Sequence, residues 1–229
     1  MPVFLEDLVD PFYEPVGNHF RNLFVRGQFH WIHISYTQQN IQLWRPVALD
    51  VSGTSAAAFE IVPPGPDVFR RRTPLHTPKL ETNEEFLVTR AKVRPVILMS
   101  PSTPVRQAQA IPGGGRVHRP LAIVIPVFSL ADRFTGNTKY DSDFIERMRL
   151  LEFPEFIYLP PHAGVLPVPS YARVGEAQAV YEAHLEPRNL KLRDEALKIL
   201  QGQLRFLVSQ TYAGPFAAYR EQLLHQEAG

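Results

Sequence analysis

Two apolar, β-branched runs constrain the fold of this chain more than any other feature. Residues 94–100 read Arg-Pro-Val-Ile-Leu-Met-Ser, and residues 121–127 read Leu-Ala-Ile-Val-Ile-Pro-Val. Short continuous apolar runs of this kind are typical of buried strands. Proline, serine and glycine residues fill the segment between them, so the simplest connection is a long antiparallel hairpin. The two runs predict a sheet at the centre of the fold.

Further elements are expected on both sides of these runs. Alternating side chains predict strands, and apolar residues three or four positions apart predict helices. The expected strands cover residues 28–36, 44–51, 59–62, 156–159 and 170–180, and the expected helices cover residues 17–26, 142–151, 193–210 and 216–225. Helix 193–210 has an apolar stripe that includes Leu200 and Val208. Gly202 inside it weakens the helix by about 1 kcal/mol relative to alanine.

Composition excludes several classes of protein. The 22 prolines among 229 residues favour short strands joined by rigid loops. The chain has no cysteine, which excludes disulfides, thiolate zinc sites and thiol nucleophiles. A formal net charge of +1 creates no overall field toward nucleic acid or membrane, so any such binding is local. The sequence has no apolar run of membrane-spanning length and no basic leader. We therefore expect a cytoplasmic protein that does not associate with a membrane.

The pattern of elements predicts one main domain with additions. Residues 1–27 are expected to form an N-terminal extension, residues 28–210 the main domain, and residues 211–229 a tail with a short helix. The segment at about 37–92 is expected to be an insertion or cap inside that domain. Because a structureless loop of this length is unusual in a compact domain, it is expected to hold local strands.

The sequence lacks the familiar catalytic and cofactor motifs. It contains no nucleophile elbow, zinc-protease helix, dinucleotide fingerprint or zinc-deaminase pair, so no cofactor and no metal are expected. His30 and His33 are three residues apart on an expected strand, so they point to opposite faces and are not expected to share a metal.

What remains is a set of arginines near strand ends. Arg94 and Arg173 are placed to hold a phosphate through bidentate hydrogen bonds, or each merely marks the end of a strand. Arg70, Arg71 and Arg72 form a basic triplet. It either contacts phosphates or is a solvated loop that pairs with nearby glutamates.

The order of these elements resembles the MazF/PemK/Kid toxin family. Residues 94–101 look like its Arg-Pro-x-Val-Val-Leu-Ser motif, and residues 121–129 are similar to its strand ending in Pro-x-Thr/Ser. The first strand of the family is similar to residues 28–36, and the end of its domain to residues 169–180 followed by residues 190–208. The resemblance covers residues 28–36 and 94–209.

The resemblance implies a mainly β fold with α-helix, an SH3-like small β-barrel closed by a C-terminal helix and usually assembled as a homodimer. It implies a toxin–antitoxin pair, in which an antitoxin protein covers the substrate groove of the toxin. It also implies an endoribonuclease that cleaves single-stranded RNA without metal. The ribose 2′-hydroxyl attacks the adjacent phosphate, leaving a cyclic phosphate and a free 5′-hydroxyl.

Carried over to this chain, the resemblance assigns roles to particular residues. Arg94 and Arg173 bind the scissile phosphate, Glu176 is the base or acid, and Ser129 supplies a hydrogen bond. The RNA-binding residues expected from their charge are Arg70, Arg71, Arg72, Arg90 and Lys92.

Three departures from the family pattern leave other interpretations open. The glutamate-containing loop before Arg94 is replaced by residues 89–93, and Gly175-Glu176 stands where the family has Asp-Gln. Phe128 aligns with the family threonine, which leaves Ser129 one residue along and on the opposite face. A catalytically silent barrel that binds a protein or nucleic acid is the alternative, and an unrelated β-rich domain is a third interpretation.

Overall fold

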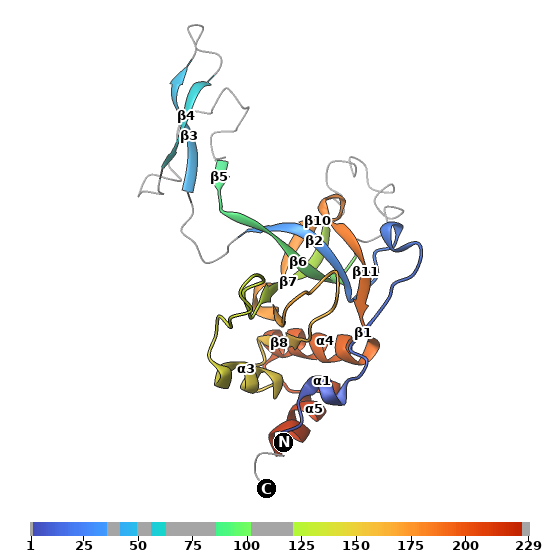
Figure 1. Cartoon of the computed structure of the whole chain (residues 1–229). Coiled ribbons are helices and arrows are strands. Elements are labelled where there is room, and N and C mark those ends of the chain that lie inside the picture. Colours follow the sequence, from blue (N-terminus) through green and yellow to red (C-terminus); the bar gives the residue numbers. More distant parts are fainter. Residues whose placement is uncertain (1, 36–41, 50–55, 63–85, 102–120, 226–229) are drawn as a thin grey trace. The chain divides into compact units, whose positions relative to one another are not determined.

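The computed structural model describes residues 2–35, 42–49, 56–62, 86–101 and 121–225 (Figure 1). The chain separates into two units, one made of Met1–His33 with Val93–Gly229 and the other of Ile34–Lys92. The fold is mixed α/β and contains a curled antiparallel sheet that forms a half-barrel. None of the helices in the described part of the chain has the length and apolar character needed to cross a membrane.

The unit Ile34–Lys92 contains a three-stranded antiparallel sheet in the order β4-β3-β5. Its strands are β3 (Gln42–Leu49), β4 (Ala56–Val62) and β5 (Phe86–Val88). Strands expected at residues 44–51 and 59–62 are thus confirmed, although each begins earlier than expected. β3 lies between its two partners, and Trp44 is opposite Ile61 of β4 and Phe86 of β5.

The other unit is built on the curled sheet, whose strand order is β1-β11-β2-β6-β7-β9-β8. The two apolar runs of the sequence are β6 and β7, and they pair antiparallel as expected, with Val96 opposite Pro126. The bounds are β1 (Tyr13–Glu14), β2 (Gln28–Ser35), β6 (Ala91–Ser100), β7 (Leu121–Ser129), β8 (Phe156–Leu159), β9 (Ser170–Arg173), β10 (Gln178–Tyr181) and β11 (Glu186–Leu192).

β7 pairs with three strands. Besides β6, it pairs with β10 along its first half, where Val124 is opposite Gln178, and with β9 at its end, where Phe128 is opposite Tyr171. Between β9 and β10 the chain forms a 3₁₀ turn, η3 (Val174–Glu176). The single strand expected over residues 170–180 is therefore wrong at its centre. The physical reason is that the backbone N–H of Ala177 donates to the carbonyl of Val174 at 3.1 Å, which closes the turn and takes the chain off the ladder with β7, while the N–H of Val174 donates to the carbonyl of Glu155 at 2.8 Å.

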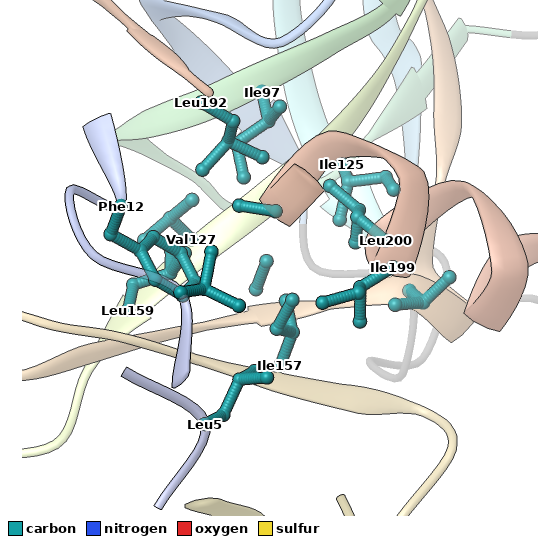
Figure 2. Close-up of a cluster of buried hydrophobic side chains, with 14 of the residues drawn as sticks. Leu5, Phe12, Ile97, Ile125, Val127, Ile157, Leu159, Leu192, Ile199 and Leu200 are labelled. Carbon is teal, nitrogen blue, oxygen red and sulfur yellow. The ribbon is translucent and has the colours of Figure 1, made fainter. Parts of the chain in front are cut away.

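The main hydrophobic core lies between one face of this sheet and three helices. Those helices are α1 (Leu5–Leu8), α4 (Asp194–Ser209) and α5 (Gly214–His225). Figure 2 shows how Ile125 and Val127 of β7 lie against Ile199 and Leu200 of α4. All four side chains are buried. Helix α4 is confirmed within one residue at each end, and α5 confirms the helix expected at 216–225.

A second, smaller cluster occupies the opposite face of the same strands. It contains Leu130, Met148, Tyr158 and Tyr171, with Met148 contributed by α3 (Ser142–Arg149). Asp141 caps α3 as expected, since its side chain accepts a hydrogen bond from the backbone N–H of Asp143 at 2.8 Å. Because side chains alternate along a strand, Val127 faces the main core while its neighbour Phe128 faces this second cluster.

Gly202 allows α4 and α5 to pack closely. A Cβ at this position would lie 2.5 Å from the Cβ of Phe216 on α5. The loss of helix propensity expected from the sequence is thus accompanied by a close helix contact that only glycine permits. Val208, in contrast, does not belong to the buried stripe, because its side chain is 84% exposed. It lies about 80° around the helix from Leu200.

The segment expected to be a helix at residues 17–26 forms only a 3₁₀ turn, η1 (Phe20–Asn22). The side chain of Gln28 explains this. Its Nε2 donates to the carbonyl of Phe20 at 3.0 Å, and its Oε1 accepts from the backbone N–H of Val25 at 3.2 Å. Each of these two backbone groups would form a hydrogen bond within a helix. Here both are bonded instead to the buried side-chain amide of Gln28.

Candidate functional site

Two arginines and a row of aromatic side chains lie across the sheet face opposite the main core. The guanidinium carbon of Arg94, on β6, lies 4.4 Å from the ring centroid of Phe128 on β7. Phe128 is in turn stacked on Tyr171 of β9, with centroids 5.4 Å apart and an interplanar angle of 21°. These contacts follow from the strand register, because Phe128 and Tyr171 are opposite each other.

The same series of contacts continues to a second arginine. Tyr171 meets Phe156 of β8 edge to face at 5.5 Å, and the guanidinium carbon of Arg173 lies 5.8 Å from the Phe156 ring centroid. Arg173 and Phe156 are also opposite each other in the pairing of β8 with β9. Arg94 and Arg173 therefore lie on one face, joined through three aromatic rings. We call these five residues the arginine face.

Glu176 is held against Arg173. Its Oε1 is 2.9 Å from Nη1 of Arg173, and the two side chains are 13% and 31% exposed. The 3₁₀ turn η3 is the local cause, since residues three apart in such a turn lie on the same side. A guanidinium has five N–H donors, so this ion pair leaves Arg173 further donors for a ligand oxygen.

A pair of tyrosines supports the centre of the arginine face. The hydroxyls of Tyr140 and Tyr171 are 2.9 Å apart, and their rings meet edge to face at 5.8 Å. Burial, reinforced by the hydrogen bond with Tyr140, raises the pKa of Tyr171 well above its ordinary value. At neutral pH the Tyr171 hydroxyl is thus protonated and acts as a hydrogen-bonding group.

Ser129 lies apart from the arginines. It is the last residue of β7, and alternation along the strand places it on the side opposite Phe128. Its Oγ accepts a hydrogen bond from Nζ of Lys139 at 2.7 Å. Of the four residues expected in catalysis, the structure brings Arg94, Arg173 and Glu176 to one face and leaves Ser129 on the other side of the strand.

The residues expected to bind RNA fall elsewhere. Arg70, Arg71 and Arg72 lie outside the described residues. Arg90 and Lys92 are exposed and belong to the unit Ile34–Lys92. Their role stays a prediction.

Sequence reasoning did not single out the aromatic residues of the site. Phe128, Phe156 and Tyr171 are each followed two positions later by another residue of the same sheet face, Leu130, Tyr158 and Arg173 respectively. A spacing of two on a strand places side chains on one face, and that signal is present in the sequence. The alignment of the three strands brings the rings together, and the sequence contains no local signal for that alignment.

The two histidines of β2 lie on opposite faces, as expected. His30 is fully buried and His33 is exposed. Among the described residues, no group of three or more histidine, aspartate or glutamate side chains is arranged to hold a metal ion.

Neither protein-family models nor curated protein sequences give a match to this chain. The chemistry of the site follows from its own side chains. Two guanidinium groups can bind phosphate oxygens, the half-buried rings of Phe128 and Phe156 can contact bases, and the Glu176 carboxylate can accept a proton close to Arg173.

Proposed function

We propose that this protein binds single-stranded RNA on the arginine face and cleaves it by attack of the ribose 2′-hydroxyl, without a metal ion. One observation carries the proposal: Arg94 and Arg173 lie on the same sheet face, and the carboxylate of Glu176 is 2.9 Å from Arg173. A cation and a proton acceptor are thus adjacent, as they must be where a hydroxyl attacks a neighbouring phosphate.

Binding combines charge with aromatic surface. Guanidinium groups hold phosphate oxygens bidentately, and aromatic rings take up unpaired bases. With a formal net charge of only +1, the attraction to RNA comes from this local arrangement and not from the protein as a whole. Duplex RNA keeps its bases stacked on one another, so the site favours single strands.

The proposed reaction is a transesterification. Glu176 accepts the proton of the 2′-hydroxyl while the 2′-oxygen forms a bond to phosphorus. The bond between phosphorus and the 5′-oxygen breaks, and that oxygen takes a proton from water. The products are a 2′,3′-cyclic phosphate and a 5′-hydroxyl. Arg94 and Arg173 stabilise the additional negative charge on the phosphate oxygens in the transition state.

The fold that accompanies this proposal is the SH3-like barrel of the MazF/PemK/Kid toxins, in a homodimer that an antitoxin protein inhibits in the cytoplasm. The curled antiparallel half-barrel and the long helix α4 after the last strand β11 support it. Helix α5 extends beyond the part of the chain that resembles the family.

A second function is favoured by the surroundings of Ser129. Its hydroxyl is bonded to Lys139 on the side of β7 away from Phe128. If cleavage needs the hydrogen bond that the resemblance assigns to Ser129, the arginine face would bind RNA without cleaving it. The second candidate is therefore a catalytically silent barrel that uses the arginine face for binding a nucleic acid or a protein.

The test is incubation of purified protein with mixed single-stranded RNA in EDTA, followed by analysis of fragment ends. Arg94→Ala and Arg173→Ala are compared with Arg188→Ala. Arg188 is a close match for Arg173, because it pairs with Glu186 at 2.8 Å and lies 5.8 Å from the ring centroid of Trp31.

Fragments with 2′,3′-cyclic phosphate ends from the wild type and Arg188→Ala, but not from the other two variants, are the expected result. Binding of RNA without cleavage would favour the silent barrel. Cleavage that EDTA abolishes, or that survives in Arg173→Ala, would contradict the proposed mechanism.

A further inference from the structure

A phenylalanine is fully presented to solvent beside the arginine face. Phe134 is 94% exposed, the highest fraction among the exposed large hydrophobic side chains of the described residues. It lies on the turn between β7 and α3, in the yellow-green part of the chain in Figure 1. Single exposed hydrophobic residues are common on protein surfaces, so exposure alone does not indicate a role.

The turn that carries Phe134 is held in one conformation. Oδ1 of Asp132 accepts hydrogen bonds from the backbone N–H groups of Phe134 and Thr135, both at 2.9 Å, and from the Thr135 hydroxyl at 3.2 Å. These bonds lower the pKa of Asp132. The backbone N–H of Asp132 donates to the carbonyl of Asn137 at 2.8 Å, and Gly136 has a φ of +72°. The backbone under the exposed ring is thus preorganised.

The same turn is tied to the candidate site at its far end. Lys139 donates its backbone N–H to the carbonyl of Leu130 at 2.7 Å and its Nζ to Ser129. Tyr140, the next residue, contacts Tyr171 of the arginine face. The turn therefore begins and ends beside the strand that carries Phe128.

The surroundings of Phe134 suit a nucleic acid better than a protein. Every residue from 133 to 140 is exposed, and the charged side chains among them, Arg133 and Lys139, are both cations. The two carboxylates that flank this segment, Asp132 and Asp141, each accept hydrogen bonds from backbone N–H groups. A protein contact of high affinity needs an apolar patch that becomes fully desolvated, whereas a base needs only the free face of one ring and a cation near its phosphate.

We propose that Phe134 stacks on an unpaired base of the RNA strand bound to the arginine face, with Arg133 close to the adjoining phosphate. This inference rests on the proposed function and adds a base contact outside the scissile phosphate. Phe134 is a binding residue that acts on a neighbouring nucleotide.

The test measures equilibrium binding of a mixed-sequence single-stranded oligoribonucleotide that carries 2′-O-methyl groups, so that no cleavage occurs. Phe134→Ala is expected to weaken binding about tenfold through the loss of one stacked base. Phe134→Trp is expected to keep the affinity of the wild type, and its additional indole fluorescence is expected to be quenched by the RNA. Arg133→Ala is expected to reduce the slope of log affinity against log salt by about 0.7.

Two controls separate stacking from other effects. Val208→Ala removes another strongly exposed hydrophobic side chain, 84% exposed on α4, and is expected to leave RNA binding unchanged. Thermal unfolding of Phe134→Ala is expected to match the wild type, because the ring makes almost no buried contact. Binding to duplex RNA is expected to be the same for Phe134→Ala and the wild type.

The outcomes distinguish this inference from the proposed function. Binding by Phe134→Ala at wild-type strength, while Arg173→Ala loses it, would overturn the stacking contact and leave the proposed function in place. An equal loss on single-stranded and duplex RNA would also overturn it. Absence of RNA binding by the wild type would remove both proposals. Loss of self-association in Phe134→Ala with unchanged RNA binding would overturn stacking and assign the ring to a protein interface.

Discussion

Arg173 and Glu176, three residues apart in the chain, form an ion pair with 2.9 Å between Nη1 and Oε1. In a continuous strand, residues three apart point to opposite faces. The 3₁₀ turn between β9 and β10 removes that alternation and brings the carboxylate to the guanidinium. The interruption of the strand, which the sequence did not predict, is therefore what assembles this part of the candidate site.

Replacing Glu176 tests its role as the proton acceptor. Glu176→Gln is expected to lower the single-turnover rate of RNA cleavage by about a hundredfold or more, since it removes a general base. RNA affinity is expected to be equal or higher, because one negative charge beside the phosphate is lost. Glu186→Gln, which removes the matched partner of Arg188, serves as the control. A wild-type cleavage rate in Glu176→Gln would exclude this carboxylate as the base.

The planar guanidinium of Arg94 is expected to be essential in its own right. Arg94→Lys keeps the charge but loses the flat contact with Phe128 and bidentate binding of phosphate. We expect kcat/KM for cleavage to fall at least about tenfold, while the free energy of unfolding falls by no more than about 1 kcal/mol. Kinetics and chemical denaturation measure the two effects. Full activity of Arg94→Lys would mean that only the positive charge at this position matters.

The stability of the protein is expected to depend on pH through His30. Its ring is stacked on Phe24 at 5.4 Å, its two nitrogens have no hydrogen-bond partner among the residues that the structure describes, and burial lowers its pKa from 6.5 to about 4. Glu182 acts in the opposite direction but is the smaller effect. The unfolded chain therefore binds a proton at a higher pH than the folded protein. The free energy of unfolding is therefore expected to be highest above pH 6.5. It is expected to fall by up to about 3 kcal/mol as the pH is lowered toward 4.

Denaturation of His30→Leu across this pH range provides the measurement. The variant is expected to lose most of the decrease in stability between pH 6.5 and 4, whereas His33→Gln, at an exposed position of the same strand, is expected to retain it. Identical pH profiles for wild type and His30→Leu would show that His30 is not the group responsible.

Alanine at Gly202 is expected to destabilise the protein in spite of its better helix propensity. The new Cβ would lie 2.5 Å from the Cβ of Phe216, which is part of a fully buried side chain. Overpacking of this kind typically costs 1–3 kcal/mol, against a gain of about 1 kcal/mol in propensity. We expect a lower melting temperature, with Gln201→Ala on the same helix as the control. An increase in the melting temperature of Gly202→Ala would show that α5 moves away at little cost.

Local patterns in the sequence were sufficient to predict most of the longer strands and helices, but not β1, β11 or α1. Residues 156–159 form the strand β8 with the expected bounds, and α4 differs from residues 193–210 by one residue at each end. Both depend on neighbours in the chain: apolar content in a short run, and a repeat of three to four residues. The same holds for the cap that Asp141 forms on α3.

Relationships between distant residues were not predictable in this way. At the interruption the N–H of Val174 is bonded to Glu155, which precedes β8 and is distant in the sequence, and the segment near Phe20 depends on the side chain of Gln28. Phe128 was noted only as a departure from the toxin-family pattern. Its place between Arg94 and Tyr171 requires the register of three strands, which a single sequence does not specify.

The pairing of β7 with β6, β9 and β10 restricts which insertions, deletions and substitutions β7 can accept during evolution. Inserting or deleting one residue within β7 would turn Phe128 toward the helices and Val127 toward the arginines, and would shift the pairing with all three neighbours. Substitutions in β7 can therefore accumulate one at a time, but its length cannot change. Changes of length are expected to be confined to the connections that precede and follow the strand.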